Sequence, residues 1–140
     1  WEEHCAWFDR VNRDPEITLC LVSVAMGPFG VVRFDGATPG VYEVSINTNP
    51  CLRHQGLGWQ ALVSSINYLR SEKPVELLFA MLKRANRASY RTFEKAGFTF
   101  LSPEIPYNSH VAEWNPDKEV YCERRCSLPD IGAGFYSLSP

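Results

Sequence analysis

Apolar residues form three strand-like runs in the first third of the chain. Residues 17–25 and 29–34 are rich in β-branched and apolar side chains, and residues 41–48 alternate between apolar and polar positions. Both patterns are typical of β-strands. Turn-forming residues, including five glycines or prolines, occupy residues 27–28 and 35–40. The pattern therefore predicts a meander of three consecutive strands joined by turns.

Three other segments read as helices. Residues 2–12 and 56–70 each place apolar side chains at helical spacing. In the first these are Cys5, Trp7, Phe8 and Val11, and in the second Leu62, Ile66 and Leu69. Residues 86–96 form the third, and Gly97 follows at the position where helices commonly end.

The run at residues 75–81 is almost entirely apolar, which predicts a central strand covered on both faces. Because a helix separates it from the strand at residues 41–48, the two strands should be parallel and joined by a right-handed crossover. We expect further strands at residues 98–101 and 119–126, a loop at 102–117 and a tail at 127–140.

Length and composition indicate one globular domain over residues 1–140. A hydrophobic fraction of 45% and a charged fraction of 21% are ordinary for a chain with a sizeable core. The net charge of −2 argues against a nucleic-acid partner. No apolar run approaches the ~20 residues that span a bilayer, and the chain does not open on a signal-peptide pattern. We therefore expect neither a nucleic-acid nor a membrane partner.

The cysteines do not form the pattern of a disulfide framework, because they are odd in number and irregularly spaced. They are Cys5, Cys20, Cys51, Cys122 and Cys126. The last two could supply half of a zinc site, but no second Cys/His pair with ligand spacing accompanies them. We expect no metal, and buried free thiols in a reducing, cytoplasmic compartment.

A glycine-rich turn joins the third strand to the helix after it. Its sequence is Arg53-His54-Gln55-Gly56-Leu57-Gly58. Free N–H groups and the dipole at a helix N-terminus bind phosphate, and glycine lets the backbone approach closely. The stretch lacks the Lys-Ser/Thr of a P-loop, and Leu62 lies near where a dinucleotide fingerprint needs its third glycine. Alone, the turn fits a phosphate site and a ligand-free connection about equally.

A second motif lies about thirty residues downstream: Asn86-Arg87-Ala88-Ser89-Tyr90-Arg91-Thr92-Phe93-Glu94-Lys95-Ala96-Gly97-Phe98. Together the two motifs resemble the GNAT superfamily of N-acetyltransferases over residues 17–100. The resemblance implies an α/β (α+β) fold, with a mixed, bent sheet, helices on both faces and a parallel strand–helix–strand crossover at the cofactor. The family's first strand would precede the first helix, so we expect the domain to lack it.

The resemblance also implies the co-substrate acetyl-CoA. Backbone groups on the strand at Ile46-Asn47-Thr48 would bond the pantetheine arm as a neighbouring strand does. The turn would hold the pyrophosphate through the backbone of His54, Gln55, Gly56, Leu57 and Gly58, with Arg53 as a nearby cation. A glycine is common at the position of His54, but only its backbone is needed. Asn86 would bond the arm, cap its helix, or do both.

Transfer to an amine needs a base, because an amine with a pKa near ~10.4 is mostly protonated at neutral pH. Glu43 is the first candidate and His110 the second. The family's acid, a tyrosine that protonates the CoA thiolate, aligns with Phe93, which cannot donate a proton. Tyr90, one helical turn earlier, is the substitute candidate. Water could also suffice, because the thiol pKa lies near ~8.5.

The sequence gives only weak signals for the amine that accepts the acetyl group. Residues 30–35 and 43–46, with Glu2-Glu3-His4 and Trp7-Phe8, resemble the branch that acetylates amino sugars on nucleotides. The expected partner is therefore a small-molecule primary amine, and a homodimer is left open. Two alternatives remain: a peptide or protein N-terminal acetyltransferase, and an acyl-CoA-binding domain that has lost catalysis, as Phe93 would allow.

Overall fold

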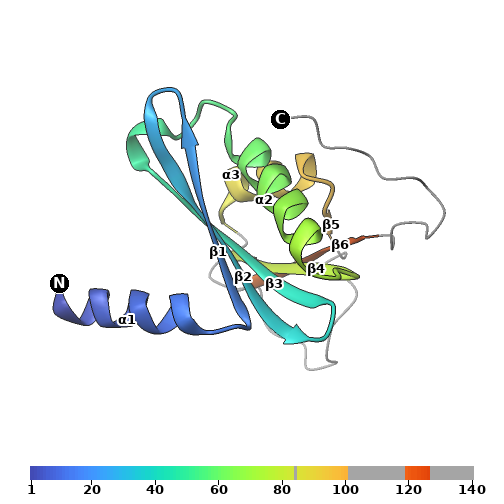
Figure 1. The fold of residues 1–140 in the computed structure, drawn as a ribbon. Coiled ribbons are helices and arrows are strands. Elements are labelled where there is room, and N and C mark those ends of the chain that lie inside the picture. The colour runs from blue at the N-terminus through green and yellow to red at the C-terminus, as the bar shows by residue number, and fades with distance from the viewer. Residues whose placement is uncertain (84, 101–118, 127–140) are drawn as a thin grey trace.

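A computed structural model describes residues 1–83, 85–100 and 119–126. Helices and strands follow one another there in the expected order (Figure 1). The elements are α1 (Glu2–Arg13), β1 (Ile17–Val24), β2 (Gly27–Thr38), β3 (Val41–Thr48), the 3-10 helix η1 (Pro50–Leu52), α2 (Gly58–Glu72), β4 (Leu77–Lys83), α3 (Arg87–Lys95), β5 (Thr99–Phe100) and β6 (Glu119–Arg125). The loop and tail expected at 102–117 and 127–140, with His110, lie outside the described residues.

The six strands form one mixed sheet in the order β1-β2-β3-β4-β6-β5. The meander β1–β3 is antiparallel, and β4 pairs in parallel with β3. The parallel crossover through α2 is thereby confirmed. In Figure 1 the long strands β1–β3 turn steeply away from β4 and β6, so the sheet is strongly bent, as expected.

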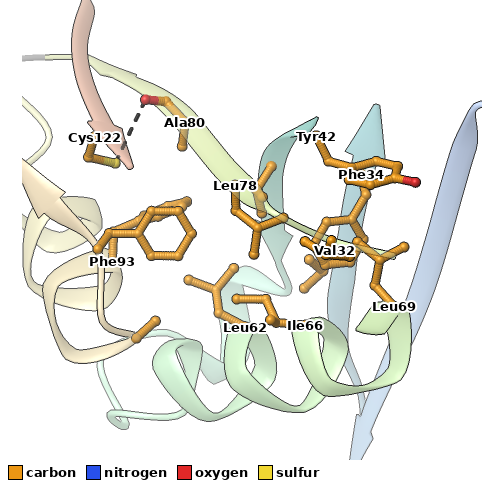
Figure 2. Packing of buried hydrophobic residues seen from close by; sticks show 14 of the residues in the cluster. Val32, Phe34, Tyr42, Leu62, Ile66, Leu69, Leu78, Ala80, Phe93 and Cys122 are labelled. Carbon is orange, nitrogen blue, oxygen red and sulfur yellow. Dashed lines mark hydrogen bonds between the residues drawn. The ribbon is translucent and has the colours of Figure 1, made fainter. Parts of the chain in front are cut away.

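One face of the sheet carries the core. In β2 the fully buried residues are Val32 and Phe34, and in β4 Leu78 and Ala80. Figure 2 shows Leu62, Ile66 and Leu69 of α2 pointing toward this face, with Phe93 of α3 beside them. A fully buried Leu or Phe contributes about 1.5–3 kcal/mol relative to an exposed one. This packing fixes the position of both helices over the sheet.

The opposite face is covered only in part. Trp7 of α1 lies against Arg33 of β2, with the guanidinium carbon 5.6 Å from the ring centroid. Arg33 is on the face away from α2, since its neighbours in the strand, Val32 and Phe34, point into the core. α1 therefore touches the sheet on the face opposite to α2, but most of α1 is exposed and extends away from the sheet (Figure 1). None of the helices in the described segments is long and apolar enough to cross a membrane.

Several details differ from the predictions. The first turn lies at residues 25–26, because Gly27 already pairs with Val24. The expected turn at 35–40 shortens to 39–40, because β2 continues through an irregularity between Gly36 and Thr38. Cys5 and Phe8 are exposed on α1, whose buried apolar residue is Val11.

The strand expected at 75–81 starts later and is not covered on both faces. It runs over Leu77–Lys83, and Met81 is 39% exposed. The run is apolar on both sides, and among the described helices α2 and α3 pack against it, on one face. The other face of β4 carries the Phe79 ring, which stacks on Tyr121 with centroids 5.9 Å apart.

Candidate functional site

Strands β3 and β4 separate in the middle of the sheet. Their parallel register covers Val41–Glu43 of β3 against Leu77–Phe79 of β4. Beyond Glu43, β3 pairs with β2 alone, and β4 pairs with β6. Residues 44–48 of β3 therefore present one strand edge without a neighbouring strand in the described part of the chain. An edge of this kind can hydrogen-bond an extended ligand.

The connection from β3 to α2 starts with a locally fixed turn. The N–H of Asn49 donates to the Phe29 carbonyl at 2.6 Å, and its side chain accepts from the N–H of Cys51 at 3.0 Å. His54 and Gly56 then have positive φ angles of 63° and 71°. Gly56 adopts this conformation without steric cost, whereas His54 does not. His54 thus holds a backbone conformation that glycine adopts more easily, and the expectation that His54 serves the site through its backbone alone stays a prediction.

The N–H groups of this turn have no acceptor among the residues that the structure describes. None of the N–H groups of residues 54–58 donates a hydrogen bond within the described residues; the first that does is Ala61, to the Leu57 carbonyl. They stand at the N-terminus of a fifteen-residue helix, α2, where the dipole adds about half a positive charge. This is the arrangement of an anion-binding site.

A cleft of about 620 Å³ connects the turn, the free edge of β3 and α3. Its size is typical of a site for a small ligand or cofactor. Ten residues assigned to the cofactor on sequence grounds line it: Ile46, Asn47, Thr48, Arg53, His54, Gln55, Gly56, Leu57, Gly58 and Asn86. Residues far apart in the sequence thus meet in one cavity.

Arg53 is held at the end of β3. Its guanidinium donates to the hydroxyl and the carbonyl of Thr48, at 3.2 and 3.3 Å. The Thr48 carbonyl is therefore occupied by the protein itself. Arg53 is exposed and lines the cleft. Its two hydrogen bonds to Thr48 hold the guanidinium against the end of β3.

Asn86 caps α3. Its side-chain oxygen accepts a hydrogen bond from the N–H of Ser89 at 3.1 Å, as a helix N-cap does. Its amide nitrogen donates no hydrogen bond within the described residues, and Asn86 lines the cleft. Capping is thus observed, and the amide N–H₂ is available for a ligand.

Five α3 residues in the cleft wall were not predicted as site residues: Ala88, Ser89, Arg91, Thr92 and Lys95. They recur at helical spacing on one side of α3. Helical periodicity counted from Asn86 could have identified them.

The two proposed catalytic residues lie outside the cleft lining. Glu43 is exposed at the last β3–β4 pair, opposite Phe79, on the face away from α2. Tyr90 is half-buried, and its ring stacks on Phe100 at 4.6 Å between centroids. Phe93 is 1% exposed and packs edge-on against Phe98. Phe93 is therefore a core residue.

The cysteines show no pairing and no cluster. All five are free thiols; Cys122 and Cys126 are buried, whereas Cys5 and Cys51 are exposed, which corrects the expectation that all are buried. In the described segments no group of three or more potential ligands could hold a metal ion. Burial raises the pKa of the Cys122 thiol to about 12, so this thiol stays protonated.

No family model and no curated protein matches the sequence. Solved structures do match. The Campylobacter jejuni N-acetyltransferase PseH in complex with acetyl coenzyme A is 20% identical, with a TM-score of 0.71 over 90% of this chain and 79% of that one. Spermidine N-acetyltransferase from Vibrio cholerae, in complex with CoA and spermine, is 12% identical, with a TM-score of 0.72 over 89% and 74%.

A third match is an acetyltransferase of the GNAT family from Streptococcus pneumoniae. It is 14% identical, with a TM-score of 0.66 over 89% of this chain and 76% of that one. At such identities the likeness concerns the fold. The resemblance drawn from the two sequence motifs is thereby confirmed at this level, and the chain has the mixed α/β fold of the GNAT acetyltransferases.

Proposed function

We propose that this chain is an acyl-CoA-dependent N-acetyltransferase that moves an acetyl group from acetyl-CoA directly to a primary amine of a small molecule. The observation that carries the proposal is the row of N–H groups at residues 54–58 without acceptors among the described residues, facing a cleft at the start of α2. Pyrophosphate is the anion that such a row accommodates. The proteins of similar fold include structures with acetyl coenzyme A and with CoA.

The free edge of β3 fits the other end of the carrier. An extended pantetheine arm has amides that can pair with residues 46–48 as a strand would. A backbone N–H there would also polarise the thioester carbonyl, as an oxyanion donor does. The amide of Asn86 offers a further donor to the arm. The cleft thus provides for phosphates at the turn and for amides along β3.

Glu43 is the proposed base. Its neighbour across β2–β3, Asp35, is paired with Arg33 at 2.6 Å. Glu43 itself has no ion pair or hydrogen bond within the described residues. It can therefore take a proton from the ammonium group, directly or through a water, on the open face beside Phe79.

The amine nitrogen then bonds to the acetyl carbon, the C–S bond breaks, and the thiolate takes a proton. Tyr90 is the proposed proton donor. Its ring is fixed against Phe100, which would hold the phenol in place.

A calorimetric titration with acetyl-CoA, followed by a thiol-release assay on a panel of amines, tests the proposal. The panel contains a nucleotide-linked amino sugar, our first candidate acceptor, together with spermidine and a peptide N-terminus. Binding of acetyl-CoA with turnover on a small amine supports the proposal. Turnover on the peptide alone would favour a peptide or protein N-terminal acetyltransferase. Binding of acetyl-CoA without turnover on any amine would favour an acyl-CoA-binding domain that has lost catalysis. Absence of binding at millimolar carrier would overturn the assignment.

Glu43→Gln should lower kcat by about 10²–10⁴ with unchanged affinity for acetyl-CoA. The matched control is Glu94→Gln, which neutralises an exposed carboxylate on α3 outside the cleft lining. Tyr90→Phe keeps the ring on Phe100 and removes only the hydroxyl. A loss of kcat without loss of stability is expected. If both variants keep full kcat, the roles of Glu43 and Tyr90 are excluded while the transfer reaction stands.

A further inference from the structure

The α3 wall of the cleft carries two cations, Arg91 and Lys95, one helical turn apart. Both are exposed, and both line the cavity. Residues four apart on a helix are neighbours on its surface, so these two charges lie side by side. They form a basic pair on the wall of the cleft that α3 contributes.

The basic pair has no acidic partner in the part of the chain that the structure describes. Neither side chain has an ion pair or hydrogen bond there. The described residues that line the cleft include no aspartate or glutamate. Like charges at this spacing repel each other, which suits a site where a multiply charged anion is bound.

The pyrophosphate does not need this pair. The turn at residues 54–58 already offers its own row of N–H groups, and Arg53 is fixed beside it through Thr48. The basic pair belongs to a different helix, α3, whose Thr92 lies against Gly58, so the pair stands beside the turn rather than in it. It therefore fits a further anionic group on the same ligand.

We infer that Arg91 and Lys95 bind the 3′-phosphate of the adenosine ribose in CoA. This rests on the proposed function. A phosphate monoester has a second pKa near ~6, so it carries close to two negative charges at neutral pH, enough to neutralise both side chains. The pair would make the protein select 3′-phosphorylated CoA over carriers that have the same pantetheine and pyrophosphate without that group.

The test compares CoA with 3′-dephospho-CoA in calorimetric titrations. We expect the wild type to bind CoA at least about tenfold more tightly, as charge-assisted contacts at an exposed site would give. The double variant Arg91→Gln/Lys95→Gln should lose most of that preference, because its affinity for CoA falls. Its affinity for 3′-dephospho-CoA should stay within about twofold of the wild-type value. Arg87→Gln, on the same helix but outside the cleft lining, should keep the preference.

Equal binding of the two ligands by the wild type would overturn the inference and leave the proposed function standing. An equal loss of both ligands in the double variant would also overturn it. Failure of the wild type to bind either ligand would remove both proposals. Thermal unfolding without ligand, unchanged from the wild type, would show that the double variant folds. If the double variant does not fold, the comparison of the two ligands on the wild type still tests the inference.

Discussion

Gly58 and Thr92 bring the first turn of α2 against α3. A Cβ atom built on Gly58 would lie 3.1 Å from Cγ2 of Thr92 and 3.4 Å from its hydroxyl oxygen. This is tighter than ordinary van der Waals contact. The absence of a side chain at Gly58 therefore sets how closely the turn at residues 54–58 approaches the α3 wall of the cleft.

We expect Gly58→Ala to destabilise the fold by about 1 kcal/mol, because added carbon in a close contact forces small shifts. In a Thr92→Ser background, which removes Cγ2, the same change should be neutral or stabilising, since alanine favours a helix over glycine by about 1 kcal/mol. Urea unfolding of the four proteins in this double-mutant cycle measures the coupling. Additive effects would show that the contact carries no strain.

Substitutions at the two residues of the turn with left-handed backbone conformation, His54 and Gly56, should change the stability of the protein in opposite directions. Gly56 has a φ of 71° and no atom within 4 Å of a built Cβ. Gly56→Ala should therefore cost about 1 kcal/mol through backbone strain alone. His54→Gly removes such strain at a φ of 63° and should leave stability equal or up to about 1 kcal/mol higher. Denaturation midpoints measure both, and a stabilising Gly56→Ala would contradict the observed backbone.

Asn86 allows capping and ligand binding to be separated. Asn86→Ala loses the hydrogen bond from the Ser89 N–H and should cost about 1 kcal/mol of stability. Asn86→Asp keeps a capping oxygen, so stability should be retained. It replaces the amide N–H₂ with a negative charge in the cleft, so affinity for CoA should fall at least about tenfold. Equal affinity in Asn86→Asp and wild type would exclude Asn86 from the ligand site.

Cys122 should make stability depend on pH in the alkaline range. Burial raises the pKa of this thiol from 9.0 to about 12. Between these values the unfolded chain has lost the thiol proton and the folded chain keeps it. Stability should therefore fall as pH rises from about 9, by at most about 1.4 kcal/mol per pH unit. The comparison is Cys122→Ala, whose urea midpoint should fall less steeply from pH 8.5 to 10.5.

The same burial predicts how the thiols react. In the native protein a thiol reagent should modify the exposed Cys5 and Cys51 quickly, and Cys122 only on unfolding. Peptide mass mapping after a short exposure identifies the modified positions. Fast labelling of Cys122 would show that the sheet opens there.

Local signals predicted much of the site. Asn86 is a residue type that caps helices, and it does so; Gly97, expected to end α3, follows it with a φ of 91°. The turn at Gly56 and Gly58 was found from its glycines, since only backbone conformation and close approach were needed. These features depend on neighbours within a few residues.

Features that depend on distant partners were harder to predict. The hairpin ends at Gly27 and Thr38 are set by pairing across strands, so turn residues alone misplaced them. Met81 is exposed because it lies on the face of β4 that points away from α2 and α3, and the apolar run itself does not show which face the helices cover. Arg91 and Lys95 were not assigned to the site, because helical spacing from Asn86 gives their side of α3 only once it is known that this side borders the cleft, and that depends on the contact of α3 with α2.

The short pairing of β3 with β4 has a mechanical consequence. Within the described residues, three residue pairs, Val41–Glu43 with Leu77–Phe79, join two three-stranded plates of the sheet, β1-β2-β3 and β4-β6-β5. Just before these pairs, the Gly40 carbonyl also accepts from the N–H groups of Glu76 and Leu77. A molecule lying in the gap beyond Glu43 would bridge the plates and oppose their flexing about this short pairing. Occupancy of the gap should therefore stiffen parts of the protein that never touch the occupant, including the far edge at β1.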